Sequence, residues 1–272
     1  MHTHRIILVF CLLCPILGHA QTGYGYAGAR SVAMAGSSVT NEDVFSAGNN
    51  QAGLAFLEQS AAGISTQNYF LVEGGINAYH GAGALTTKNS GAFGITLDYF
   101  GDNTLNQTKI GLGYGRKLAK NVALGVQLDY IGTSTTEIGS AAAFTFAAGV
   151  LYKPNSAVSI GAHVFNPIRA ETGFDYTEEL PAIFNLGLSY HPSDKIILCA
   201  QAEQTIDADM RIRTGIEYHL VEQLSLRCGY ASAPSIFSAG AGVHFGDLEI
   251  QLAAQWHQQL GTSPAFGLVY AF

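Results

Sequence analysis

Apolar side chains alternate with small or polar ones along most of this chain, from about residue 60 to the last residue. Within 93–99, and again within 122–130, every second residue is large and apolar, and the residues between are Gly, Ala, Thr, Gln and Asp. A period of two indicates β-strands with one apolar face, and no helical period of similar strength follows residue 60. With two weaker candidates at 60–70 and 75–87, we expect an all-β fold of about 14 strands, each roughly 10–12 residues long.

The composition excludes several other classes of protein. Charged residues make up only 12% of the chain and hydrophobic residues 48%, whereas a soluble protein of this size carries about a quarter charged residues. A helical membrane protein would show apolar runs of roughly 20 residues, and none occurs after residue 20. The net charge of -7 leaves no basic patch for nucleic acid, so we expect no nucleic-acid partner.

The first 20 residues are typical of a secretory signal peptide. Arg5 precedes an apolar core over 6–17, which is too short to cross a bilayer comfortably. Gly18 and Ala20 are small residues at the positions that a signal peptidase reads, so we expect cleavage between Ala20 and Gln21. An uncleaved membrane anchor is the alternative.

A period of two is compatible with both a soluble sandwich and a membrane barrel, because it does not say which face meets water. The connections between the expected strands favour the barrel. They are very short on one side, as at 88–89 and 192–193, and mostly longer on the other, as at 131–140 and 167–180. Short turns on one side and longer loops on the other are the rule for outer-membrane barrels.

The aromatic residues on the apolar faces sort into two rings under this arrangement. Amphipathic rings prefer the membrane–water interface, so a barrel is expected to have two such girdles. The girdle on the long-loop side comprises Tyr99, Tyr130, Tyr230 and Trp256, and the other comprises Tyr114, Tyr152, Tyr190, Tyr218 and Tyr270. The chain then ends on a lipid-facing aromatic residue, Phe272, which we interpret as the C-terminal assembly signal. We predict a transmembrane antiparallel β-barrel over 60–272, in the bacterial outer membrane, with outer-membrane lipid and the barrel-assembly machinery as partners.

Residues 21–59 do not alternate and are rich in Gly, Ala, Ser and Asn. We hypothesise that this segment is a hatch that plugs the lumen. It would otherwise cap the barrel from below or hang loose in the periplasm.

Short motifs in this segment resemble the opening of the PorV/PorQ family, which are outer-membrane barrels of the Bacteroidota distantly similar to FadL-type transporters of hydrophobic compounds. The motifs are the stretches 28–36 and 49–55, and Gln51 stands where that family usually has Pro. Phe165-Asn166-Pro167, Leu180-Pro181 and the stretch 186–190 also resemble the family, so the similarity spans most of the mature chain. The resemblance implies a 14-stranded barrel with an N-terminal hatch and a role in type IX secretion.

No motif indicates catalysis or a bound cofactor, and we expect neither. The stretch 23–28 matches the G-x-G-x-x-G pattern, but the strand that a dinucleotide site requires does not precede it. His163, His219, His244 and His257 lie on separate expected strands without tight spacing, so we interpret them as lumen-facing polar residues and expect no metal site.

A strip of charged side chains is expected on the lumen face of neighbouring strands. It comprises Glu203, Arg211, Arg213, Glu217, His219 and Arg227. One interpretation is a ladder of salt bridges that stiffens the wall. The other is an anion-attracting strip or a docking site for the hatch.

Two functions follow from these expectations. The first is a barrel associated with type IX secretion that binds secretion-system proteins or cargo. Its candidate partner surface is the loop 167–180, whose charged residues are Arg169, Glu171, Asp175, Glu178 and Glu179. The alternative is a FadL-like transport channel for a small or hydrophobic solute.

Overall fold

A computed structural model of the chain describes residues 26–71, 75–88, 91–136, 139–173 and 177–272. The expected signal peptide, its cleavage site and most of the 23–28 motif lie outside these residues. No helix in the described ranges is long and apolar enough to cross a membrane. The elements are α1 (Ala29–Ala33), α2 (Ser46–Asn49), η1 (Gln51–Phe56), β1 (Ala61–Asn68), β2 (Asn77–Thr87), β3 (Gly91–Gly101), β4 (Leu105–Ala119), β5 (Val122–Thr135), β6 (Gly139–Tyr152), β7 (Val158–Phe165), β8 (Glu171–Gly173), β9 (Thr177–Glu179), β10 (Ile183–Ser193), β11 (Ile196–Thr205), β12 (Arg211–Val221), β13 (Leu224–Ala231), β14 (Ile236–Phe245), β15 (Leu248–His257) and β16 (Gly261–Ala271).

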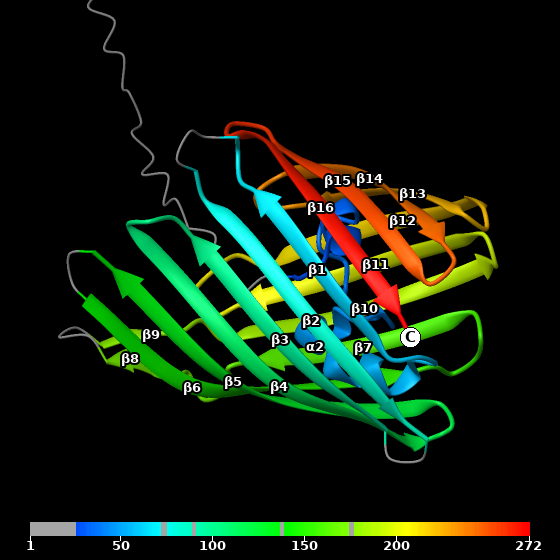
Figure 1. The fold of residues 1–272 in the computed structure, drawn as a ribbon, viewed down its shortest axis with the longest axis horizontal. Coiled ribbons are helices and arrows are strands. Elements are labelled where there is room, and N and C mark those ends of the chain that lie inside the picture. The colour runs from blue at the N-terminus through cyan, green and yellow to red at the C-terminus, as the bar shows by residue number, and fades with distance from the viewer. Residues whose placement is uncertain (1–25, 72–74, 89–90, 137–138, 174–176) are drawn as a thin grey trace, which may run out of the picture.

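Fourteen of the strands form one closed antiparallel barrel, which confirms the predicted fold class (Figure 1). Each strand pairs with its neighbours in the chain, and β1 pairs with β16 to close the ring, with Ala61 opposite Ala271. β8 and β9 form a separate two-stranded sheet between β7 and β10. We call the end of the barrel that holds Ala61 and Ala271 the short-turn end, and the opposite end the loop end.

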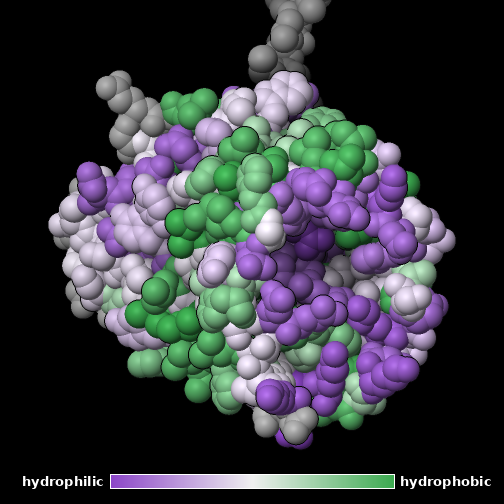
Figure 2. Space-filling view, turned by 45° about the vertical axis from the view of Figure 1, so that its right-hand side comes forward, coloured by the Kyte–Doolittle hydropathy of each residue, from purple (hydrophilic) through white to green (hydrophobic). Residues whose placement is uncertain are grey.

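The apolar faces of the strands point outward. On β5, Leu128 is 71% exposed, whereas the neighbouring Gln127 is 2% exposed and faces the lumen. Figure 2 shows a hydrophobic outer surface beside a hydrophilic hollow that opens at one end of the molecule. Exposed apolar residues outside and buried polar residues inside are the polarity of a transmembrane barrel, the reverse of a soluble sandwich.

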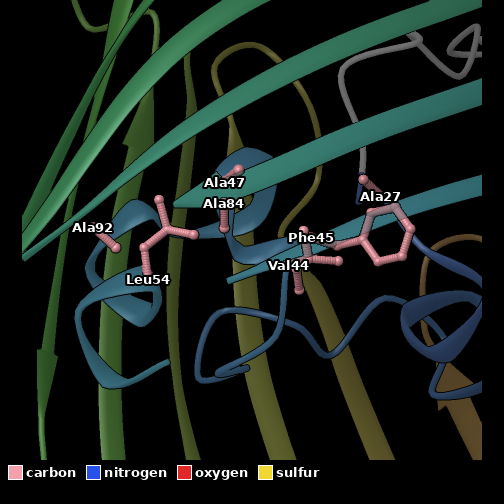
Figure 3. Close-up of a cluster of buried hydrophobic side chains, with 8 residues drawn as sticks. Ala27, Val44, Phe45, Ala47, Leu54, Ala84 and Ala92 are labelled. Carbon is pink, nitrogen blue, oxygen red and sulfur yellow. The ribbon is translucent and has the colours of Figure 1, made fainter. Parts of the chain in front are cut away.

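The lumen is filled by the N-terminal segment, of which residues 26–57 are described; we call these residues the hatch. The short helices α1, α2 and η1 belong to it and lie inside the ring of strands (Figure 1). Its apolar side chains pack together and against small wall residues such as Ala84 and Ala92 (Figure 3). The hatch begins near the loop end, where Tyr26 contacts Gln255, and ends at Leu57, beside the start of β1. The hydrophobic core therefore lies largely between the hatch and the wall.

Candidate functional site: the hatch and its seat in the lumen

The hatch is fastened to the wall near the short-turn end by Arg30 of α1. Its Nε donates to the Glu217 carboxylate of β12 at 2.8 Å, and its Nη1 lies 3.1 Å from Asp43 of the hatch. Glu217 also accepts from Arg227 at 3.1 Å, and Arg227 in turn donates to Glu249 at 2.9 Å. Arg30 therefore joins the hatch to an ion-pair chain that crosses β12, β13 and β15.

Arg30 keeps its positive charge in this setting. Burial by itself would lower the pKa of its guanidinium, but the carboxylates of Glu217 and Asp43 outweigh that effect and raise the pKa above its ordinary value. The hatch therefore carries a permanent cation into the acidic part of the lumen wall.

A second ion-pair cluster lies nearer the loop end. Arg213 donates to Glu203 across β11 and β12, at 2.8 Å from Nη2 to Oε1, and its Nη1 donates to the backbone oxygen of Ala35 in the hatch at 2.7 Å. Its guanidinium also lies over the Tyr26 ring. Arg211 lies on the same face, 3.6 Å from Glu203, and donates to the backbone oxygen of Ala233 in the β13–β14 turn.

All six residues of the predicted charged strip therefore lie on the lumen side, in two groups: Arg211 and Arg213 lie around Glu203, and Arg227 and His219 lie around Glu217. His219 completes the set, 3.5 Å from Glu217. The strip contains salt bridges between neighbouring strands and also contacts the hatch, through Arg213 and Glu217, so the ladder and the docking site for the hatch coexist.

Neutral side chains of the wall also bind the hatch backbone. The Gln201 side-chain oxygen accepts from the amides of Ser38 and Val39, at 2.9 and 3.0 Å. The Ser238 hydroxyl donates to the Ala33 oxygen at 2.8 Å, and Gln251 accepts from the Arg30 amide at 3.1 Å. Alternation along β11, β14 and β15 places these residues inside the barrel, but nothing in the sequence singles them out as hatch contacts.

Glycines on both sides of the lumen complete the seat, at places where the hatch backbone comes too close for any side chain. A Cβ at Gly125 of β5 would overlap the backbone of Gln51 and Ala52, and one at Gly229 of β13 would overlap Met34 and Ala35. The inner face of β4 likewise carries glycines, at Gly111, Gly113 and Gly115. Gly115 faces Gln51 and Leu54 of the hatch, so the lumen space beside it is occupied.

The hatch motif that resembles the PorV/PorQ opening has a structural role. Asn49 forms a reciprocal pair with the Ala27 backbone, with bonds of 2.8 and 3.0 Å. The Asn50 side chain caps η1 by accepting from Ala52 and donates to the backbone oxygens of Val39 and, on the wall, Val150. These amides hold the turns of a segment that has little regular secondary structure of its own.

A cluster of apolar side chains covers the inner wall near the loop end. It comprises Ile131, Ala143, Ala147, Phe165, Leu180 and Ile183. Leu180 comes from the loop between β7 and β10, which folds into the barrel mouth. The fully buried Asn166 holds this loop, because its Nδ2 donates to the Leu180 oxygen at 2.8 Å and its Oδ1 accepts from the Ala170 amide at 2.9 Å.

A cavity of about 30 Å³ lies between this cluster and the hatch. Phe165 and Ile183 line it on the apolar side, and Ser38 and Asn49 line it from the hatch. His163 also borders it and is 8% exposed, and neither of its ring nitrogens has a hydrogen-bond partner among the described residues. A space of this size holds only water-sized groups.

The remaining predicted residues lie as follows. The nine girdle aromatics are on outward-facing positions; Tyr99 packs against Tyr79, Tyr130 against Phe144, and Tyr230 against Phe237, which also contacts Trp256. Phe272 is 61% exposed and stacks on Tyr270 next to the closing strand. In the expected partner loop, Arg169 forms an ion pair with Glu179, Glu171 is exposed, and Asp175 and the Glu178 side chain lie outside the described parts.

No protein-family model matches the sequence, and a search of curated proteins found none that matches. Solved structures do resemble it. The toluene transporter TodX of Pseudomonas putida has a TM-score of 0.73 at 14% identity, covering 92% of this chain and 99% of that one. The monoaromatic hydrocarbon channel CymD gives 0.72 at 12% identity, covering 93% and 99%. A Pseudomonas aeruginosa FadL homologue gives 0.67 at 12% identity, covering 91% and 98%.

The fold and the seat together define a class of protein: a closed 14-stranded antiparallel barrel whose lumen holds an N-terminal hatch. Within that class, the barrel has the FadL-like fold of the hydrocarbon channels named above, from end to end of their chains.

Proposed function

We propose that the protein is an outer-membrane channel that carries a small hydrophobic solute past a movable hatch, with the short-turn end in the periplasm. The observation that carries the proposal is the apolar cluster inside the loop-end mouth, around Ile131, Phe165 and Ile183, next to the cavity above the hatch. In a barrel that carries polar solutes such a lining is unfavourable, because it would expose apolar surface to water each time the mouth opens. The hydrocarbon channels with the same fold support this choice of solute.

The hatch explains how such a channel remains closed to polar molecules. It is held by Arg30, Arg213 and Gln201 on one side and packs tightly against glycines such as Gly125 on the other. A solute that enters the apolar mouth must displace part of this seat to pass, so ions and sugars are excluded while the hatch remains in place.

Uptake by intact cells tests the proposal. We expect cells that produce the protein to accumulate radiolabelled toluene faster than cells with an empty vector. Their uptake of sucrose should be the same as that of the empty-vector cells. A variant with Phe165→Asp and Ile183→Asp in the mouth should lose the toluene gain while remaining folded in the membrane. Equal toluene uptake with and without the protein, or faster sucrose uptake, would contradict it.

The secretion-associated role implied by the sequence resemblance is a second candidate. The feature that favours it is the charged hairpin β8–β9, where Arg169 pairs with Glu179 at the loop end. The similar structures are transport channels, which favour the first candidate. Co-purification of the tagged protein with secretion-system components, without toluene uptake, would favour the secretion-associated role over transport.

A further inference from the structure

The basic side chains outside the lumen gather at the short-turn end. Among the described residues, six of these basic side chains lie at the short-turn end: Lys88, Arg116, Lys117, Lys120, Lys153 and Lys195. One, Arg169, lies at the loop end. This is unexpected in a chain of net charge -7. Lys153 is paired with Glu42 of the hatch at 2.8 Å.

Three of these residues border one hollow of about 590 Å³, which we call the basic hollow. It lies where the hatch leaves the lumen, between the hatch end (Leu54, Ala55, Leu57 and Glu58) and the ends of β2, β3 and β4. Three of its described lining residues are basic, namely Lys88, Arg116 and Lys117, and one, Glu58, is acidic. Within the described ranges, no carboxylate lies within salt-bridge distance of these three basic groups.

One wall of the basic hollow is formed by the hatch and by the inner face of the barrel. Leu54 and Ala92 on its wall are buried at 0% and 1% exposure, and both belong to the cluster inside the barrel. Lys117 lies over the ring of Phe56 in the hatch, 4.5 Å from its centroid. Because Leu54, Ala55 and Leu57 of the hatch also border the hollow, an occupant there contacts the hatch as well as the rim.

The opposite arc of the same rim has the reverse charge. Asp194, Glu222 and Asp247 occupy the turns β10–β11, β12–β13 and β14–β15, with Lys195 as the basic residue among them. The rim therefore has a basic and an acidic half, and an acidic partner is drawn to one half and repelled by the other.

We propose that the basic hollow docks an acidic, partly apolar segment of a periplasmic protein, at the place where the hatch joins the barrel. Carboxylates of the segment pair with Lys88, Arg116 and Lys117, and its apolar side chains cover Leu57 and Ala55. The proposal relies on the proposed orientation in the outer membrane but not on the identity of the transported solute.

The test uses the full protein in nanodiscs of phosphatidylcholine and a fluorescein-labelled peptide of Leu and Glu, with the matching Leu and Lys peptide as comparison. We expect the acidic peptide to bind at least about tenfold more tightly by fluorescence anisotropy, with an affinity that falls as salt is raised. The double variant Lys88→Gln, Arg116→Gln should weaken binding about tenfold, since neither side chain has an ion-pair partner in the described structure. Lys195→Gln on the acidic arc is the matched control and should leave binding unchanged.

Equal binding of both peptides, or equal losses in the double variant and in Lys195→Gln, would overturn the proposal. A membrane role for the same side chains is a separate outcome. If the double variant retains less phosphatidylglycerol when extracted from cells but binds the acidic peptide as well as the unaltered protein, the basic hollow serves lipid. Toluene uptake is measured independently, so failure here and failure of the transport function are distinguishable.

Discussion

Arg211 and Arg213 are the same residue type on the same face of β12, and yet their partners differ. Both approach Glu203, but Arg213 is 2% exposed and reaches the Ala35 oxygen of the hatch, whereas Arg211 reaches the β13–β14 turn. Alternation predicts the face of each side chain but not its depth or what fills the lumen beside it. The charged strip was therefore predictable as a set, and the division of roles within it was not.

Replacing Arg213 with Gln should loosen the hatch near Ala35. The variant loses a buried, charge-assisted hydrogen bond worth about 1.5–3 kcal/mol, and Glu203 loses its closest partner. We expect amide exchange at Ser38 and Val39 to quicken by at least about tenfold, measured by hydrogen–deuterium exchange and mass spectrometry. Arg211→Gln should leave exchange in the hatch nearly unchanged, and a similar acceleration in both variants would show that Arg213 does not hold the hatch.

At the scale of elements, the strands of the barrel were predictable and the hairpin β8–β9 was not. Each barrel strand has one face in lipid and one in the lumen, which imposes a strict period on its residues. Each strand of the hairpin spans only three residues, and neither crosses the membrane, so no period marks them. The helical turns of the hatch escape prediction for a similar reason. They are short and buried on nearly all sides, so the burial that orders them leaves no amphipathic pattern.

The fit of η1 against β5 provides a test at this scale. Gly125→Ala places a methyl group on the backbone of Gln51 and Ala52, so the hatch must shift, at a cost of about 1–3 kcal/mol. We expect a lower urea midpoint by circular dichroism. Gly132→Ala on the same strand is the control, because its Cβ would make only ordinary contact with the Tyr130 ring and should change stability by less than about 0.5 kcal/mol. Matching losses would show that contact with the hatch is not the cause.

At the scale of the whole molecule, the barrel and the hatch are held together by different kinds of bond. The ring of strands is closed by backbone hydrogen bonds, including those between β1 and β16. The hatch is held by side chains and by close packing, and contributes no strand to the ring. Removing the hatch therefore leaves every pair of barrel strands in place.

A chain without the hatch, residues 26–57, should fold into an open pore. Its lumen would then be lined by exposed polar groups such as Gln201, Ser238 and Glu217, which favour water and ions. We expect steady conductance in planar bilayers from this variant and none from the intact protein. Equal conductance from both would mean that the hatch does not close the barrel.

The link between Leu57 and Ala61 sets the fate of a displaced hatch. Only residues 58–60 separate the hatch from the first strand, and a chain of that length reaches on the order of 14 Å. A hatch that leaves its seat remains tethered by this short link near the short-turn opening. Its effective concentration at the seat is then in the millimolar range or above. Return of a displaced hatch is then a first-order event within one chain, independent of how many copies the membrane holds, so the time for which the lumen would stay open depends on the length of this link.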